Sequence, residues 1–234
     1  MHYIWILILT AFWTIILGFI GILFSLFETK KGSSLGALAR IWAKLILFFS
    51  RVSYSVTGLD NLELNKNYIF AGNHASGLDI LLAFGGLPFW LVSIAKKELR
   101  SIPILGFVMS KAGHIFVDRN NRERALESLE QAKESLKETP RSVLLFPEGT
   151  RTRDGSLGPF KKGGLLLGVE IGIPIVPIAF CKTFEALDKG TFSMNNQPIE
   201  LRIGSPISSD NYSFESRKEL ATIIRNEVKK LLDD

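Results

Sequence analysis

A histidine and an aspartate, separated by four residues, stand directly after an apolar segment. From Asn73 the sequence reads Asn-His-Ala-Ser-Gly-Leu-Asp, so the pair is His74 and Asp79. On one straight helix, five positions would turn the two side chains about 140° apart. They can meet only if His74 precedes a helix and Asp79 lies in its first turn. Asp79 would then accept the Nδ1 proton and leave Nε2 free to act as a general base toward a hydroxyl group.

The same residues also allow a purely structural interpretation. Residues 76–79 read Ser-x-x-Asp before an apolar run that begins at Ile80, which is close to a capping box. Asp79 would then cap a helix, and His74 would be an ordinary turn residue. The local sequence leaves both interpretations open.

A second polar segment, Phe-Pro-Glu-Gly-Thr-Arg-Thr-Arg, occupies residues 146–153 after another apolar run. Its proline and glycine predict a loop at the carboxyl end of a strand, where open α/β sheets bind ligands. Arg151 could hold a phosphate with its bidentate fork, while Thr150 and the N–H groups around Gly149 could add hydrogen bonds. A lysine pair begins nearby at Lys161. The alternative is a solvated basic loop.

Further cations follow two other short apolar runs. Arg119 ends the segment Phe-Val-Asp-Arg, and Lys96 and Lys97 follow Ser-Ile-Ala. Arg119 could add to an anion site, and Lys96 could lie near developing negative charge. Both could equally be surface charges. We interpret His114, which precedes the Phe-Val-Asp-Arg run, as structural.

Short β-like runs alternate with helical patterns after Gly58 and predict an α/β domain, a mixed central sheet flanked by helices. The expected strands are 68–71, 90–95, 115–117, 142–146, 175–180 and 199–203. The expected helices are 122–138, capped by Asn120 or Asn121, and a last one around 220–232 that packs on the sheet. Two prolines in the run Ile-Pro-Ile-Val-Pro from Ile173 are typical of an edge strand or a strand entry.

The first 27 residues contain no Lys, Arg, Asp or Glu, and as a helix they would be roughly 40 Å long, enough to span a membrane. An amphipathic, interfacial pattern follows over residues 35–49. The leader is therefore either one spanning and one surface helix, or two helices that dip into one leaflet. We expect residues 1–50 to anchor the chain and residues 51–234 to form the catalytic domain. Lys30 and Lys31 favour a cytoplasmic end for the first helix.

Composition restricts the classes of function. The 234 residues carry a formal charge of +5 and a pI near 9.3, which suits phosphates or a membrane surface as partners. The basic residues are scattered, so nucleic-acid binding has little support. One Cys and three His exclude a disulfide framework and a zinc finger. Neither a Walker loop nor a Rossmann glycine fingerprint is present.

Four blocks occur in order along the chain: NHxxxxD from Asn73, Phe-Val-Asp-Arg ending at Arg119, Phe-Pro-Glu-Gly-Thr-Arg from Phe146, and Ile-Pro-Ile-Val-Pro from Ile173. In this order they resemble the lysophosphatidic acid acyltransferase (PlsC-like) family of glycerolipid acyltransferases. The resemblance covers roughly residues 73–178, and the hydrophobic leader fits it as well.

The resemblance implies a role for each block. His74 and Asp79 would be the catalytic pair, and the second and third blocks would bind a glycerol phosphate. By the resemblance, the residues lining this acceptor pocket are Arg119, Glu148, Gly149, Thr150 and Arg151. The segment Ala-Lys-Lys-Glu-Leu also resembles the family's, which makes its first lysine, Lys96, a phosphate or oxyanion contact.

The implied reaction moves a fatty acyl group from acyl-CoA or acyl carrier protein to the 2-hydroxyl of 1-acyl-glycerol 3-phosphate and yields phosphatidic acid. It needs no acyl-enzyme, no bound cofactor and no metal. The enzyme would sit on a membrane, with its catalytic domain on the cytoplasmic face, as in a bacterial inner membrane. Two alternatives stay open: an acyltransferase for another lyso-acceptor, such as a lyso-aminolipid or lysophospholipid, and a non-catalytic membrane lipid-binding protein. Acyl-chain length and the choice of donor are not predicted.

Overall fold

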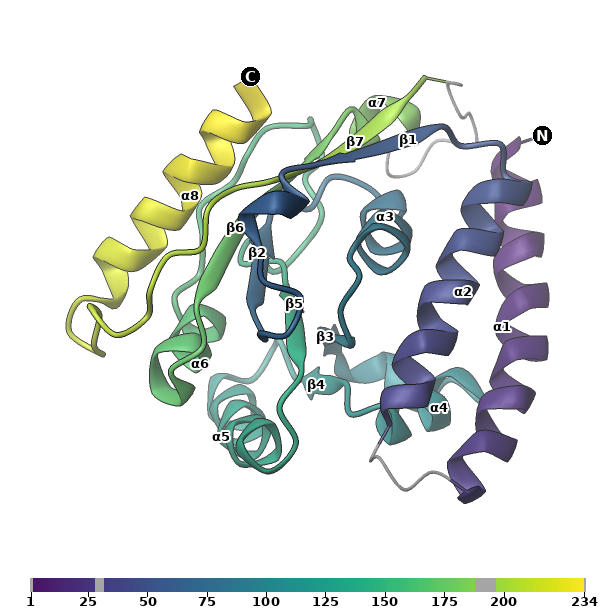
Figure 1. Ribbon diagram of the computed structural model, residues 1–234, viewed down its shortest axis with the longest axis horizontal. Coiled ribbons are helices and arrows are strands. Elements are labelled where there is room, and N and C mark those ends of the chain that lie inside the picture. The colour runs from purple at the N-terminus through teal and green to yellow at the C-terminus, as the bar shows by residue number, and fades with distance from the viewer. Residues whose placement is uncertain (1, 28–31, 188–196, 234) are drawn as a thin grey trace.

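Seven strands in the described part of the chain form one sheet, with helices on both of its faces (Figure 1). The structure is a computed structural model that describes residues 2–27, 32–187 and 197–233. The strands are β1 (Tyr54–Thr57), β2 (Ile69–Gly72), β3 (Leu91–Lys96), β4 (Ile115–Val117), β5 (Ser142–Leu145), β6 (Ile175–Cys181) and β7 (Ile199–Ile203). The α-helices are α1 (His2–Phe27), α2 (Ser33–Phe49), α3 (Leu78–Gly86), α4 (Leu105–Lys111), α5 (Arg122–Glu138), α6 (Gly163–Ile171), α7 (Thr183–Ala186) and α8 (Arg217–Asp233). Two short 3₁₀ helices are η1 (Leu59–Asn61) and η2 (Lys97–Ser101).

The strand order is β1-β7-β6-β2-β5-β3-β4, and only β6 and β7 pair antiparallel. The predicted mixed sheet is therefore confirmed. Strands β2, β5, β3 and β4 are parallel neighbours, so their carboxyl ends meet at one edge of the sheet. The loops after these four strands contain the segments that the sequence marked for chemistry, which brings those segments together in space.

The six expected strands are present, each with ends within one residue of the expected range. Helix α5 has the predicted bounds, and the Asn121 side chain caps it by accepting the N–H of Arg124 at 3.0 Å. The sequence missed β1. Its four residues are mostly exposed and it lies at the edge of the sheet, so it carries no buried alternation to recognise.

Of the two alternatives for the Ile-Pro-Ile-Val-Pro run, the edge strand is wrong, because β6 is buried along its whole length between β7 and β2. The strand entry is confirmed for Pro174, which directly precedes β6. Pro177 is tolerated there by a bulge. Ile178 pairs with Ile203, but the next bridge joins Ile175 to Ile207, so the partner strand has one extra residue. The missing N–H of Pro177 falls where the ladder is already interrupted.

The core has two parts because alternate residues of each strand point to opposite faces of the sheet. On one face, Phe70 and Leu144 pack with side chains of α3 and α2. On the other, Ile69 and Val143 pack with α5, α6 and α8. Figure 1 shows α3, α2 and α1 on one side of the sheet and α5, α6 and α8 on the opposite side. The predicted packing of α8 on the sheet is confirmed, since Leu220, Ala221, Ile224 and Val228 are buried there.

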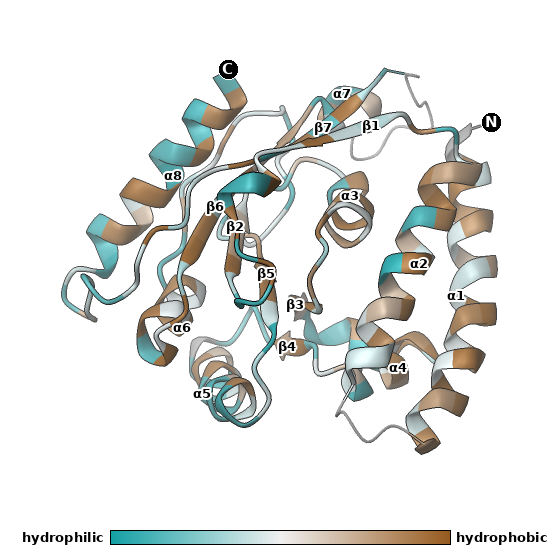
Figure 2. Ribbon diagram, viewed as in Figure 1, coloured by the Kyte–Doolittle hydropathy of each residue, from teal (hydrophilic) through white to brown (hydrophobic). Residues whose placement is uncertain are grey.

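Helix α1 is apolar on nearly all sides and is exposed along much of its length (Figure 2). Among the described residues it is the one helix long and apolar enough to cross a membrane, by length and composition. It packs along α2 and α4. Small residues permit this closeness: a Cβ on Gly18 would lie 2.2 Å from a methyl group of Ile104, just before α4. Lys30 and Lys31, on which the predicted orientation rests, lie outside the described residues.

Candidate active site

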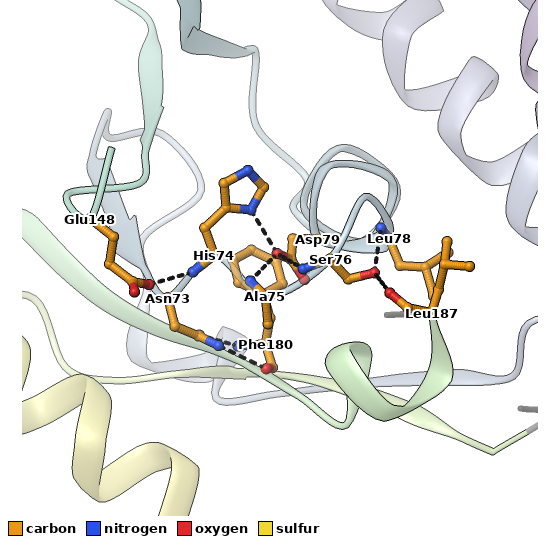
Figure 3. Close-up of polar contacts among 9 residues, drawn as sticks. All are labelled: Asn73, His74, Ala75, Ser76, Leu78, Asp79, Glu148, Phe180 and Leu187. Atoms are coloured by element: carbon orange, nitrogen blue, oxygen red, sulfur yellow. Dashed lines mark hydrogen bonds and ion pairs between the residues drawn. The ribbon is translucent and has the colours of Figure 1, made fainter. Parts of the chain in front are cut away.

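His74 and Asp79 contact each other where β2 passes into α3 (Figure 3). Strand β2 ends at Gly72, and Asp79 lies in the first turn of α3, as the spacing required. His74 Nδ1 is 2.8 Å from Asp79 Oδ2. An ionised carboxylate can only accept, so Nδ1 carries the proton and Nε2 keeps its lone pair. Nε2 is therefore the nitrogen available as a base.

Asp79 also caps the helix, so the two interpretations of the sequence describe one arrangement. The same oxygen that faces His74, Oδ2, accepts the backbone N–H groups of Ala75 and Ser76, each at 2.8 Å. The Asp79 side chain is fully buried, and its Oδ1 has no hydrogen-bond partner among the described residues. A fully buried carboxylate held by three donors is fixed in position, and it fixes the imidazole in turn.

Asn73, for which the sequence suggested no function, holds the loop against the sheet. Its side-chain amide donates to the carbonyl of Phe180 at 3.1 Å and accepts the N–H of the same residue at 2.8 Å. Ser76 adds a second tie, because its hydroxyl donates to the carbonyl of Leu187 at 2.7 Å (Figure 3). These contacts join residues more than a hundred positions apart, so no local pattern could reveal them.

Glu148 clamps the backbone of His74. One of its carboxylate oxygens accepts the N–H of His74 at 2.7 Å, and the other accepts the N–H of Gly158 at 2.9 Å. Thr152 completes the clamp by donating its N–H to the carbonyl of His74 at 2.9 Å. Burial raises the pKa of the Glu148 carboxyl, while the two backbone hydrogen bonds act in the opposite direction. With both oxygens engaged by the backbone, Glu148 has the geometry of a positioning residue.

The turn at Gly149 brings a cationic side chain against the same loop. Gly149 has φ of +77°, in the left-handed region that glycine adopts without strain. Its carbonyl accepts Nη1 of Arg119 at 2.6 Å. Arg119 is thereby held beside the loop that carries Arg151. Burial lowers the pKa of the Arg119 guanidinium from its usual value, but it stays cationic at neutral pH.

Asp118, next to Arg119, belongs to the framework. Its carboxylate accepts Nζ of Lys97 at 2.6 Å and the N–H of Asn120 at 3.1 Å. The hydrogen bond from Lys97 lowers the pKa of the Asp118 carboxyl. Both lysines are thus paired with carboxylates: Lys97 with buried Asp118, and Lys96, which is half exposed, with Glu98 at 3.4 Å.

A cavity of about 510 Å³ opens beside His74. Four of the sequence-predicted residues line it: His74, Lys96, Arg119 and Arg151. The remaining wall is mostly apolar and comes from α1, α2, α3, β3 and α4. Asp79 stands behind His74, Glu148 holds its backbone, and neither Gly149 nor exposed Thr150 contributes to the wall. The roles of Gly149 and Thr150 as phosphate contacts stay predictions.

The cavity combines a base, cations and an apolar interior. The ring of His74 stacks on Phe146, with centroids 4.0 Å apart, and its side chain is 13% exposed. An unprotonated Nε2 beside two guanidinium groups can deprotonate a hydroxyl on an anionic molecule. The long apolar wall can hold a hydrocarbon chain. These features suit an amphiphile with an anionic head.

Comparisons with known proteins agree with this chemistry. The model of a family described as Acyltransferase matches residues 53–181. A 1-acyl-sn-glycerol-3-phosphate acyltransferase from Limnanthes douglasii is 34% identical over 182 residues, which are 78% of this chain. This chain spans 64% of the length of that relative. A protein of the same name from Saccharomyces cerevisiae is 32% identical over 216 residues, covering 90% of this chain and 71% of that protein.

A solved structure has the same fold over nearly the whole chain. The crystal structure of the 1-acyl-sn-glycerophosphate acyltransferase PlsC from Thermotoga maritima superposes with a TM-score of 0.78 at 27% identity. The match covers 99% of this chain and 98% of that one. With a family model that matches more than half of the chain and a yeast relative above 30% identity, the chain belongs to the acyltransferase family, as its four ordered blocks predicted.

Proposed function

We propose that this protein transfers a fatty acyl group from a thioester donor, acyl-CoA or acyl carrier protein, to the 2-hydroxyl of 1-acyl-sn-glycerol 3-phosphate, forming phosphatidic acid. One observation carries the proposal. The Nδ1 to Oδ2 contact of 2.8 Å leaves His74 Nε2 as a base at the wall of an apolar cavity that also contains Arg119 and Arg151. The activity after which the two relatives are named supports the same reaction.

His74 does the proton chemistry of the proposed reaction. Nε2 takes the proton of the acceptor hydroxyl as the oxygen attacks the thioester carbonyl. The resulting imidazolium is stabilised by the Asp79 carboxylate. When the tetrahedral intermediate collapses, the carbon–sulfur bond breaks and the imidazolium returns its proton to the departing thiolate. The cycle ends with neutral His74 and needs no covalent acyl-enzyme.

The cations around the cavity position the acceptor. Arg119 and Arg151 are placed to hold its phosphate, which converts a bimolecular encounter into an oriented one. Lys96 lies on the same wall and could contact either the phosphate or the oxyanion of the intermediate. The apolar interior would take the acyl chain.

The direct test is product formation by the purified wild type in detergent. Labelled acyl-CoA and acyl carrier protein donors are each supplied with 1-acyl-glycerol 3-phosphate and, separately, with lysophosphatidylethanolamine. We expect phosphatidic acid from the first acceptor and little product from the second. Efficient acylation of lysophosphatidylethanolamine alone would replace the proposed acceptor. No product in any arm would refute the enzymatic function.

Replacing Arg151 by alanine is expected to raise the KM for 1-acyl-glycerol 3-phosphate by roughly 10- to 100-fold, because a charge-assisted contact to phosphate is lost. The KM for the donor should change little. Arg153→Ala is the matched control, since Arg153 is exposed two residues further on and does not line the cavity. Steady-state kinetics with each substrate varied in turn measure the two KM values. An equal rise in both variants would argue against the pocket assignment.

Membrane association is part of the proposal. Helix α1 supplies Thr10, Thr14, Leu17 and Gly18 to the cavity wall and packs on α2 and α4. Such a helix stays with the catalytic domain, so we infer that α1 and α2 lie in a single leaflet rather than spanning the bilayer. Residues 1–50 would then be the anchor and residues 51–234 the catalytic domain, facing the cytoplasm. An amphiphilic acceptor could then enter the cavity directly from the lipid. Exposing its chain to water instead would cost about 0.8 kcal/mol for each CH₂.

Charges on the outer face of α1 should weaken this association. Phe12 and Phe19 are 51% and 57% exposed, and Phe12→Glu together with Phe19→Glu should lower binding to phospholipid vesicles severalfold. Leu64→Glu is the control, because Leu64 is 66% exposed but lies in the loop before β2. Vesicle co-sedimentation measures the bound fraction. Unchanged binding by the double variant would contradict the proposed lipid-facing surface.

A further inference from the structure

The apolar part of the cavity contains a pair of polar side chains that the proposed reaction does not use. Ser93 in β3 and His114, immediately before β4, both line the cavity. His114 Nδ1 is 2.9 Å from the hydroxyl oxygen of Ser93 and accepts the backbone N–H of Ser93 at 3.2 Å. Its ring stacks on Phe84, with centroids 5.8 Å apart. Packing and hydrogen bonds therefore hold the ring in one orientation.

The contact with the Ser93 backbone determines the tautomer of His114. A backbone N–H can only donate, so Nδ1 is unprotonated and the proton of the neutral ring is on Nε2. Burial, together with the nearby charge of Arg141, lowers the pKa of His114 to about 4, which keeps the ring neutral. In the described part of the chain both hydrogen-bond contacts of the ring are made by Nδ1, and neither involves Nε2. The cavity is thus lined by a histidine with one unused donor.

The strand register places this donor well away from the reacting groups. His114 precedes Ile115, which pairs with Ile94, so His114 is level with Ser93. Lys96, at the carboxyl edge, is three residues beyond Ser93, or about 10 Å along the strand. His74 stacks on Phe146, just past β5, and β5 is separated from β4 by β3, about 10 Å sideways. A chain whose carbonyl carbon lies at His74 would pass His114 near its middle.

We propose that His114 determines specificity for the donor acyl chain: its Nε2–H donates a hydrogen bond to a chain that carries an acceptor, such as a hydroxyl oxygen, at mid-chain. This inference rests on the proposed acyltransferase function. A mid-chain hydroxyl buried in an apolar cavity is unfavourable unless it is hydrogen-bonded, and an unpaired N–H facing a plain hydrocarbon is unfavourable for the same reason. His114 therefore favours the oxygenated chain and disfavours the plain one.

The test compares donors of equal chain length in the full-length protein. The acyl-CoA donors carry no substituent, a mid-chain hydroxyl, or a hydroxyl near the methyl end, and 1-acyl-glycerol 3-phosphate is the acceptor. The measured quantity is the kcat/KM for each hydroxylated donor divided by that for the plain donor. In the wild type we expect the ratio for the mid-chain hydroxyl to exceed that for the terminal one.

His114→Phe removes the donor and keeps a flat ring to stack on Phe84. We expect the mid-chain ratio to fall by about 10-fold in this variant, because the hydrogen bond from Nε2 to the chain is lost. A merely structural defect would lower kcat/KM for all donors together. Ser93→Ala is the matched variant, because it removes the hydroxyl but leaves the backbone N–H that sets the tautomer, so most of the preference should persist.

Four results would overturn the inference. Equal ratios for mid-chain and terminal hydroxyls in the wild type would do so without any variant. An unchanged mid-chain ratio in His114→Phe would do so as well. Nitrogen-15 NMR of the wild type that finds Nδ1 of His114 protonated would show that Nε2 is not the donor. Absence of turnover with every donor would refute the proposed function, and the inference with it.

Discussion

Replacing His74 by alanine is expected to lower kcat by roughly 10²- to 10⁴-fold, because the proton transfer to and from the acceptor oxygen and the thiolate loses its base. The fold should survive. The backbone contacts of His74 with Glu148 and Thr152 do not depend on its side chain. The KM values should change much less than kcat, since the phosphate contacts proposed for Arg119 and Arg151 are untouched.

The measurement is single-turnover product formation, accompanied by a thermal melt to establish folding. His74→Gln is a useful second variant, because it retains polarity and bulk but cannot exchange a proton near neutral pH, and it should be as impaired as the alanine variant. Turnover within a few-fold of the wild type in either folded variant would end the general-base assignment.

Asp79→Asn is expected to lower kcat by about 10²- to 10⁴-fold by a different route. The change keeps the size of the side chain but removes the charge that stabilises the imidazolium. An amide oxygen could still accept the N–H groups of Ala75 and Ser76, but it is a weaker acceptor than a carboxylate. If the amide nitrogen instead faces His74, Nδ1 becomes the acceptor and Nε2 carries the proton, so the ring cannot act as a base.

Asp154→Asn is the matched control for this variant. Asp154 also accepts several hydrogen bonds, from Ser156 and Thr152, but it is exposed and does not line the cavity. Its variant should keep kcat near the wild-type value. A thermal melt of both variants adds a second readout, because Asp79 also accepts the N–H groups of Ala75 and Ser76. Loss of stability in Asp79→Asn with kcat near the wild-type value would point to helix capping as the main role of Asp79.

The clamp around His74 explains how a loop can hold a fixed geometry for the proposed chemistry. Backbone groups of His74 are fixed by Glu148 and Thr152, and the preceding Asn73 is fixed to Phe180. The loop is therefore tied to both β6 and the segment after β5. The proposed general base, positioned by so many contacts, would lose little entropy when a substrate binds.

Much of this protein was predictable from local patterns. Apolar runs and turn residues located six strands and α5, because burial on a sheet and capping of a helix depend on neighbouring residues. The spacing of His74 and Asp79 also required the contact later found at the start of α3. The order of four blocks indicated the acyltransferase family, which the comparisons confirm. Edge strand β1 and the interior position of Pro177 were missed, because each depends on pairing with a distant segment.

Only the tertiary structure decided which groups share the cavity. His114 read as a structural histidine, yet it lines the same cavity as His74, since β3 and β4 place it beside Ser93. The sequence of residues 1–50 indicated only a membrane segment, yet residues of α1 and α2 line that cavity. Glu148 read as a phosphate contact, yet its carboxylate holds backbone N–H groups. The physical reason is common to all three: residue type and spacing determine what a side chain can do, and long-range packing determines what it faces.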